Sequence, residues 1–349
     1  MPAEWEPHHA TCMTWPARED TSFPGAGHHD AVLPVFVEMI RALVQSEFVL
    51  LNGCQGEDLD YVRQALSQPE ISRVCVTGIP AVYPWCRDHG PTFLVSQDGA
   101  HLGAVNWDYN AWGGKYPEIL PKDFQINRRM AALLGARSFL PGVVMEGGSI
   151  EVNGAGAVLT TTQCLLNSNR NPHLRREQIE EVLREFLDVS TVLWLEEGIV
   201  GDDTDGHIDD ITRFVNADTV LTVVEPDTTD ANHEPLRRNL ELLKKMKTAS
   251  GSRLNILELP MPAPVVIEDC RLPASYANFY IANGIILQPV FGDQHDDKAV
   301  ETVGKCFPGR QMVPINCREL VWGLGTFHCL TQQLPEWRHR EWLMPAVGK

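Results

Sequence analysis

Apolar residues recur at steps of three and four along several stretches of this chain, which is the periodicity of an amphipathic helix. In residues 29–46 the apolar positions include Val32, Val35, Phe36 and Met39. The same periodicity predicts further helices over 57–66, 124–134, 174–187, 235–246 and 297–306. Shorter apolar runs predict strands over 48–51, 74–79, 92–95, 101–105, 138–140, 150–152, 157–161, 191–195, 255–259, 278–281, 285–289 and 312–315. Residues 1–27 show little regular pattern, so no element is predicted there.

The predicted elements repeat in one order: helix, strand, polar loop and hairpin. Turn signals such as Asn153-Gly154 and Asn283-Gly284 join neighbouring strands, and another strand pair is predicted across Ala217-Asp218. A doubly wound sheet would place single strands between its helices, so the hairpins argue against that fold. Repeated units usually stack around an axis and bring equivalent loops together. We therefore expect an α/β fold in which the polar loops of the units converge.

The composition is that of a globular protein. Hydrophobic residues make up 44% of the 349 residues and charged residues 21%, which allows a sizeable core without metals or disulfides. No apolar run approaches the length needed to cross a bilayer, and no low-complexity linker divides the chain. We expect a single domain, residues 1–349, that does not contact a membrane.

The cysteines and the N-terminus predict a cytoplasmic protein. Nine cysteines are scattered without paired short spacings, which suits thiols in a reducing compartment better than a disulfide framework. The opening residues, MPAEWEPHHATCMTW, lack the basic and apolar segments of a secretory signal.

The charge balance favours a cationic partner. The formal net charge is −17 and no basic block occurs, which argues against nucleic acid because phosphates require a positive surface. An acidic surface attracts small cations, although it also serves solubility. We expect a cationic small-molecule substrate, and a homo-oligomer stays open.

Ionisable residues recur in the polar loops of successive units. If these loops converge, they bring together Asp88, Glu146, His207, Asp209 and Cys329. Each of them alone has a structural alternative, such as a local ion pair, a turn residue or a buried thiol that acts as a small hydrophobe. Together they form a candidate catalytic set.

The chemistry of this set points to a cationic substrate. A cysteine thiol becomes a useful nucleophile when a nearby base or cation favours its thiolate, and a histidine can serve as acid and base in turn. Carboxylates crowded around the thiol would raise its pKa unless the substrate itself brings positive charge. A guanidinium does so, because its planar N–H donors match paired carboxylates.

Two other classes of protein remain open at this point. One is a metal hydrolase, since His8-His9, His28-His29, His207 and Asp209 are metal-ligand types. No His-Glu-x-x-His or paired-cysteine spacing supports it, and adjacent histidines do not readily face one metal. The other is a catalytically silent protein that binds a cationic ligand.

Several strings in the chain resemble those of the agmatine deiminase family, which is grouped with the bacterial peptidylarginine deiminases. They occur in family order from the first residues to 335. The strings are WCRDHGP at 85–91, EGGSI at 146–150, CLLNSNRNP at 164–172, GDDTDGHID at 201–209, ASYANFYIANG at 274–284 and HCLTQQ at 328–333.

This resemblance implies a fold and an activity. The fold is a five-bladed, pseudo-symmetric α/β propeller of ββαβ units, with no metal or organic cofactor. The activity is that of a hydrolase acting on C–N bonds of linear amidines, which converts agmatine to N-carbamoylputrescine and ammonia in putrescine biosynthesis. The alternative substrates are peptidyl arginine, free arginine or another alkylguanidine, with the same mechanism.

The resemblance also implies roles for the candidate set. Cys329 attacks the guanidinium carbon and forms a covalent amidino-thioether. His207 protonates the departing ammonia and then activates water. Asp88 and Asp209 hold the guanidinium nitrogens, and Glu146 orients His207 or the substrate.

Further residues are candidates for substrate binding. Trp85, Asp202 and Asp203 are candidates for the methylene chain and distal ammonium of agmatine, and Gly325 lies in the loop before the nucleophile. This chain departs from the family pattern in that loop, because Leu324 and Thr326 replace a glycine and an asparagine. Cys86 also stands where methionine is common. Leucine has less backbone freedom than glycine, so the loop can differ from its relatives and the preference for agmatine is left open.

Overall fold

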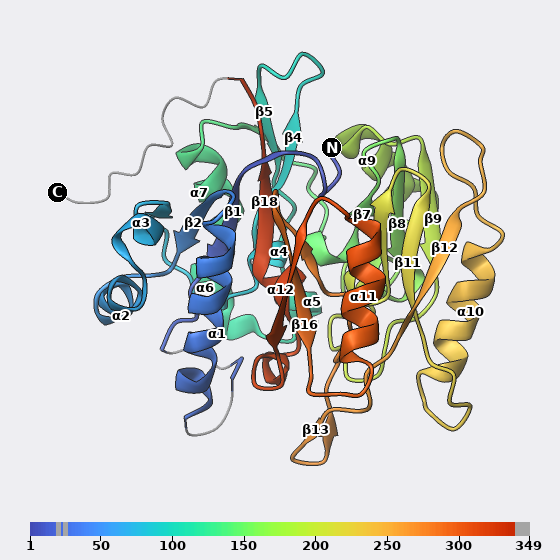
Figure 1. The fold of residues 1–349 in the computed structure, drawn as a ribbon. Coiled ribbons are helices and arrows are strands. Elements are labelled where there is room, and N and C mark those ends of the chain that lie inside the picture. The colour runs from blue at the N-terminus through green and yellow to red at the C-terminus, as the bar shows by residue number, and fades with distance from the viewer. Residues whose placement is uncertain (19–21, 24–26, 339–349) are drawn as a thin grey trace.

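The strands of this protein form several small sheets rather than one continuous sheet (Figure 1). The computed structural model describes residues 1–18, 22–23 and 27–338. Within those residues there are one four-stranded sheet, four three-stranded sheets and one two-stranded sheet. The fold is therefore mixed α/β, as predicted.

The sheets and helices take the following bounds. The four-stranded sheet has the order β18 (Thr331–Pro335), β1 (His8–Thr14), β2 (Phe48–Asn52) and β3 (Val74–Val76). The three-stranded sheets are β4 (Thr92–Val95), β5 (Leu102–Val105) and β6 (Arg137–Phe139); β7 (Glu151–Val152), β8 (Ala157–Thr161) and β9 (Thr191–Leu195); β10 (Thr212–Asn216), β11 (Thr219–Val224) and β12 (Asn255–Pro260); and β15 (Tyr280–Ile281), β16 (Ile285–Val290) and β17 (Gln311–Asn316). The two-stranded sheet is β13 (Val266–Ile267) with β14 (Cys270–Arg271).

The longer helices are α1 (His28–Leu43), α2 (Glu57–Ala65), α7 (Ile126–Leu133), α9 (Arg176–Leu187), α10 (His233–Leu243) and α11 (Asp296–Cys306). Short helical turns are α3 (Gln68–Ile71), α4 (Cys86–His89), α5 (Ala111–Gly114), η1 (Pro117–Ile119), α6 (Leu120–Asp123), η2 (Gly147–Ser149), α8 (Thr162–Leu165), η3 (Ile208–Asp210), η4 (Leu320–Gly323) and α12 (Phe327–Leu330).

Each three-stranded sheet repeats one ββαβ unit. Its first two strands pair antiparallel, a helix follows, and the third strand pairs parallel to the second. The central strand β8 is buried at every position, which is why it reads as a continuous apolar run. Helix α9 buries Ile179, Leu183 and Leu187 at four-residue steps and leaves its charged face outside. The predicted order of helices and hairpins therefore appears in the structure.

The strand β1 lies where the sequence predicted no element. It pairs antiparallel with β18, with Thr11 opposite Gln333, and parallel with β2 (Figure 1). Its sequence HHATCMT is buried almost throughout, so no alternation of apolar and polar positions reveals it. Strands from near the beginning and the end of the described residues thus share one sheet, and the short helical turn that contains Cys329 runs directly into β18.

Element boundaries differ from the prediction near the polar loops. Helix α1 ends at Leu43, before the predicted 46, and the predicted strand 278–281 shrinks to Tyr280–Ile281. Asn278 is therefore a loop residue. Leu324 adopts a left-handed backbone with φ of 72°, a conformation that suits the glycine expected at this position.

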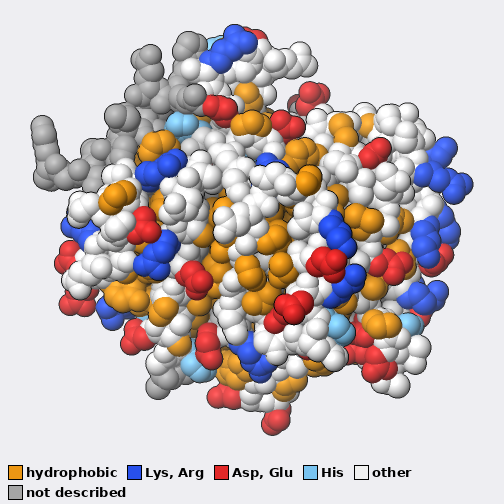
Figure 2. Space-filling model, viewed as in Figure 1, with side chains coloured by type: hydrophobic (Ala, Val, Ile, Leu, Met, Phe, Trp, Pro, Cys, Tyr) orange, Lys and Arg blue, Asp and Glu red, His pale blue; other side chains and the backbone are white. Residues whose placement is uncertain are grey.

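The visible surface carries charges of both signs. On the face shown in Figure 2, lysine and arginine side chains lie scattered with acidic groups between them. Among the described residues, none of the helices has the length and apolarity that a bilayer span requires.

A network of buried ion pairs joins five residues that lie far apart in the sequence. Glu4 accepts hydrogen bonds from Arg213 at 2.9 Å and Arg87 at 3.0 Å, and its carboxylate lies 2.9 Å from His328 Nε2. Arg213 also donates to Glu151 at 3.0 Å. Burial alone would raise the pKa of Glu4, but Arg213 and His328 hold that pKa well below its usual range. One carboxylate thus neutralises several cations that have no access to water.

Replacing Glu4 by alanine should be strongly destabilising. The variant leaves two buried guanidinium groups without their shared partner, which costs about 3–5 kcal/mol in the free energy of unfolding. Urea denaturation followed by circular dichroism measures it. Glu234→Ala, which removes an exposed pair with Arg237, serves as the control and should unfold with the wild-type midpoint. A loss for Glu4→Ala below about 1 kcal/mol would contradict this account of the network.

Candidate functional site

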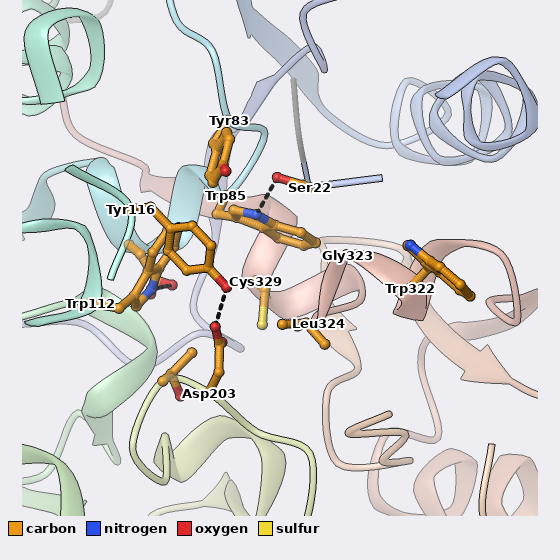
Figure 3. A pocket seen from close by; sticks show the side chains of 12 residues that line it. Ser22, Tyr83, Trp85, Trp112, Tyr116, Asp203, Trp322, Gly323, Leu324 and Cys329 are labelled. Atoms are coloured by element: carbon orange, nitrogen blue, oxygen red, sulfur yellow. Dashed lines mark hydrogen bonds between the residues drawn. The ribbon is translucent and has the colours of Figure 1, made fainter. Parts of the chain in front are cut away.

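A cavity of about 260 Å³ opens where several polar loops meet (Figure 3). Four of the predicted site residues lie on its wall. The lining residues are Ser22, Tyr83, Trp85, Asp88, Trp112, Tyr116, Asp203, Thr204, Trp322, Gly323, Leu324 and Cys329.

Cys329 presents its thiol to this cavity from the short helix α12 (Figure 3). Cys329 is only 6% exposed. Asn278 Nδ2 donates to Sγ at 3.1 Å, and Sγ lies 3.7 Å from Asp209 Oδ2. Burial and the carboxylates of Asp209 and Asp210 raise the pKa of this thiol well above its usual range. Without a bound cation the thiol is therefore neutral at neutral pH.

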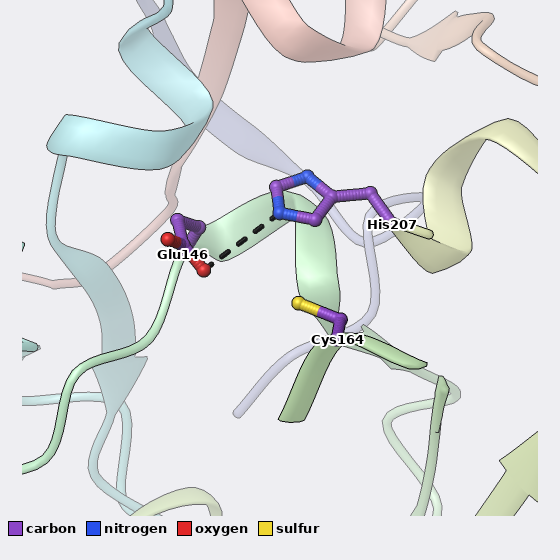
Figure 4. Close-up of side chains that lie close together, drawn as sticks. All are labelled: Glu146, Cys164 and His207. Carbon is purple, nitrogen blue, oxygen red and sulfur yellow. Dashed lines mark ion pairs between the residues drawn. The ribbon is translucent and has the colours of Figure 1, made fainter. Parts of the chain in front are cut away.

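His207 lies between two carboxylates. Its Nδ1 is 3.8 Å from Asp88 Oδ1 and its Nε2 is 3.7 Å from Glu146 Oε2 (Figure 4). Burial would lower the pKa of this imidazole, but Asp88 and the neighbouring Cys164 and Glu146 outweigh it and raise the pKa well above its usual value. His207 is thus an imidazolium that can give a proton.

Asp88 is held by two donors with little space around it. Trp112 Nε1 donates to Oδ2 at 2.9 Å, and the Gly148 amide donates to Oδ1 at 3.0 Å. A Cβ on Gly148 would lie 2.6 Å from His207 Nδ1, 2.9 Å from Asp88 Oδ1 and 3.0 Å from Asp209 Oδ2. Only glycine fits there, and the three polar atoms converge on that point. Burial, with smaller effects of the other carboxylates, raises the pKa of Asp88 to about 6.

Asp209 and Glu146 each have a buried basic side chain as partner. His328 Nδ1 lies 2.7 Å from Asp209 Oδ2, and Arg170 Nε donates to Glu146 Oε1 at 2.8 Å. Burial would raise both pKa values, but His328 beside Asp209 and Arg170 beside Glu146 lower them. Both groups are therefore carboxylates, and the second oxygen of each accepts no hydrogen bond from the described residues.

Of the residues predicted to bind the far end of the substrate, two line the cavity and one does not. Asp203 lines the cavity and accepts a hydrogen bond from the Tyr116 hydroxyl, and the Trp85 ring lies on the opposite side (Figure 3). Asp202 is not on the cavity wall. Its oxygens accept from the backbone N–H groups of Thr204 at 2.7 Å and His207 at 3.1 Å, so it shapes the loop that leads into His207.

The loop before Cys329 is closely packed against Trp85. A Cβ on Gly325 would lie 2.8 Å from Trp85 and 2.9 Å from Cys329 Cβ, so a glycine is required for this approach. Gly325 is not itself on the cavity wall. Leu324 is on that wall and is half-buried.

Several residues of the site were not predicted. Tyr83, Trp112 and Tyr116 form an aromatic group, with Trp112 and Tyr116 rings 5.6 Å apart and perpendicular. Ala111 and Trp112 both adopt positive φ before two glycines, so the Trp-Gly-Gly run could have indicated a special loop. Asn278 and His328 lie inside the family strings, but neither was given a role.

Two groups of buried side chains are of metal-ligand type. Their ligand atoms lie within 4.8 Å of one another, and the groups are Glu146, Cys164 and His207, and Asp209, Asp210 and Cys329. Hydrogen bonds already engage part of each group, because Arg170 donates to Glu146 and Asn278 donates to Asp210 and Cys329. The histidine pairs 8–9 and 28–29 belong to neither group.

The arrangement combines a thiol, an imidazolium and converging carboxylates. These groups can bind a planar cation, attack it with sulfur and supply a proton to a leaving nitrogen. That is the chemistry predicted from the sequence.

Comparisons with known proteins agree with this geometry. Residues 1–335 match the sequence profile of the Porphyromonas-type peptidyl-arginine deiminases. The chain is 37% identical to the agmatine deiminase of Ectopseudomonas mendocina, covering 96% of this chain and 95% of that protein. The structure resembles the agmatine deiminase of Enterococcus faecalis, with a TM-score of 0.86, 30% identity and coverage of 96% and 95%. It also resembles a C. jejuni agmatine deiminase solved with substrate bound, with a TM-score of 0.84, 28% identity and coverage of 97% and 96%. The chain belongs to the Porphyromonas-type peptidyl-arginine deiminase family and is similar to agmatine deiminases over nearly its whole length.

Proposed function

We propose that this protein is an agmatine deiminase, which hydrolyses agmatine to N-carbamoylputrescine and ammonia. The observation that carries the proposal is the convergence of Asp88, His207 and Asp209 on one point, with the Cys329 thiol beside Asp209. Two agmatine deiminases that are each 37% identical to this chain over 96% of its length support the same activity.

The guanidinium binds between Asp88 and Asp209. Each carboxylate accepts N–H donors of the planar cation in bidentate or paired contacts. Bound positive charge offsets the carboxylates that raise the pKa of Cys329, so the thiol releases its proton to water when the substrate is in place. The substrate thus helps to make its own nucleophile.

The reaction then proceeds in two halves. The Cys329 thiolate adds to the guanidinium carbon, and the His207 imidazolium gives its proton to one terminal nitrogen, so that the C–N bond breaks and ammonia leaves. The amidino-thioether remains on sulfur. Neutral His207 then takes a proton from water, and the resulting hydroxyl adds to the amidino carbon. The C–S bond breaks, the sulfur leaves as the thiolate, and the hydroxyl proton passes to water, which releases the ureido product. Glu146 holds the imidazole through both steps.

The cavity favours agmatine over arginine at its distal end. The methylene chain lies along Trp85, and the ammonium pairs with Asp203. Among the described residues that line the cavity there is no lysine or arginine, so the α-carboxylate of free arginine would face Asp203 without a partner. Asp202 has a role in loop structure, and Gly325 provides the clearance between Trp85 and Cys329.

The fold supports a wider inference about architecture and location. We infer that the four- and three-stranded sheets are five blades of one propeller in a single domain of residues 1–349, of which 339–349 lie outside the described residues. All nine cysteines are free thiols, which is consistent with a reducing cytoplasm.

Replacing Cys329 by serine should abolish turnover and preserve binding. Ammonia release from agmatine should fall at least about 1,000-fold, because the hydroxyl is a far weaker nucleophile in this environment. Calorimetry should still detect agmatine binding, and mass spectrometry should find no covalent adduct. Cys270→Ser, which changes an exposed cysteine, should retain full activity. An active Cys329→Ser enzyme would refute the nucleophile.

Replacing Asp203 by asparagine should reduce discrimination between substrates. The value of kcat/KM for agmatine should fall about 10-fold or more, because the distal ammonium loses its charged partner. The value for free arginine and for an arginine peptide should change much less. Ureido product is measured for all three substrates. Equal losses on agmatine and arginine would show that Asp203 does not recognise the ammonium, and wild-type turnover of arginine above that of agmatine would reject the substrate assignment.

The pH dependence should report the ionisation of Asp88. Its carboxyl is ionised above a pKa of about 6 and neutral below it, so guanidinium binding weakens as the pH falls. We expect kcat/KM for agmatine to decrease about 10-fold for each pH unit below that value. Ammonia release between about pH 4.5 and 8 measures it, with circular dichroism as a control for folding. A flat profile through this range is inconsistent with the role of Asp88.

A further inference from the structure

Asn278 makes an unusually complete set of hydrogen bonds around the nucleophile. It lies in the loop before β15 and is 1% exposed. Its Oδ1 accepts from Thr326 Oγ1 at 2.9 Å, from the His328 amide at 3.1 Å and from the Cys329 amide at 3.4 Å. Its Nδ2 donates to Asp210 Oδ1 at 2.9 Å and to Cys329 Sγ at 3.1 Å.

These partners determine which way the amide faces. Two of the three groups around Oδ1 are backbone N–H groups, which can only donate, so the oxygen must lie on that side. Asp210 supplies an acceptor on the other side and fixes one N–H. The remaining N–H of Asn278 therefore points at the sulfur of Cys329.

This N–H faces a sulfur that is otherwise surrounded by acids. The carboxyl groups of Asp209 and Asp210 lie close to Cys329 Sγ, and both oppose a negative charge on it. Asn278 is therefore a hydrogen-bond donor that can stay bonded to the sulfur in both its thiol and its thiolate form.

We propose that Asn278 is a positioning residue for the deimination reaction, which orders the loop at 326–329 and donates a hydrogen bond to the Cys329 thiolate. The role in turnover depends on the proposed function, whereas the effect on the thiol does not. Asn278 is absent from the cavity wall, so it acts through Cys329 rather than through the substrate. Its loss should change the reactivity of the sulfur more than the binding of agmatine.

The test measures Cys329 directly in the absence of agmatine. Alkylation by iodoacetamide is followed across a range of pH by mass spectrometry of the peptide that contains Cys329. Asn278→Asp has the same shape but replaces the donor by an acidic oxygen. Its apparent pKa for alkylation should rise by about 1 or more, and kcat for agmatine should fall about 10- to 100-fold with KM changed by less than about 3-fold.

Two further variants separate positioning from folding. Asn127→Asp changes an equally buried amide in helix α7, which donates to the Trp107 carbonyl at 2.8 Å, and it should leave the alkylation profile as in the wild type. Asn278→Ser removes the amide without adding a carboxyl and should slow alkylation at neutral pH about 10-fold, which keeps the test valid if Asn278→Asp does not fold.

Wild-type alkylation profiles for both Asn278 variants would overturn the proposal, as would an equal shift in Asn127→Asp. A wild-type protein that does not turn over agmatine, but whose Cys329 loses reactivity in the Asn278 variants, would reject the proposed function and retain the role of Asn278.

Discussion

One carboxylate, that of Glu4, holds the centre of this protein together. It pairs with Arg87, Arg213 and His328, which come from segments far apart in the sequence. In water such pairs contribute little, but in a dry interior the loss of one partner leaves a buried charge that water cannot solvate. His328 extends the same network to Asp209. The charge pairs of the core and the carboxylates of the site are therefore one connected system.

The same network determines which carboxyl groups around the thiol are ionised. Arg170 and His328 lower the pKa values of Glu146 and Asp209 despite burial, whereas burial raises the pKa of Asp88 to about 6. Without a bound cation, burial and the nearby carboxylates keep the Cys329 sulfur protonated. In the proposed reaction a cationic substrate offsets these carboxylates, so reactivity depends on a ligand with positive charge.

Much of the fold and of the site could be predicted from the sequence, because both depend on local patterns. Helix periodicity and turn residues gave the ββαβ order, and the polar loops gave the ionisable residues that lie closest together. β1 escaped prediction because its buried sequence, HHATCMT, contains two histidines and two threonines, so it shows neither alternation nor a continuous apolar run. Asp202 was expected to bind substrate, but its contacts with the backbone could not be read from residue type. Asn278 was missed for the same reason, since an amide carries no charge that marks it.

The pairing of β1 with β18 also has a consequence for the order of folding. The strand that follows Cys329 completes a sheet whose other members are formed from the first part of the chain. During synthesis β1, β2 and β3 leave the ribosome before β18. The sheet can be completed only when β18 is also present. The sulfur can therefore take its place beside the carboxylates of the site only after β18 has left the ribosome. Shortened products of translation would contain most of the acidic loops and no assembled nucleophile.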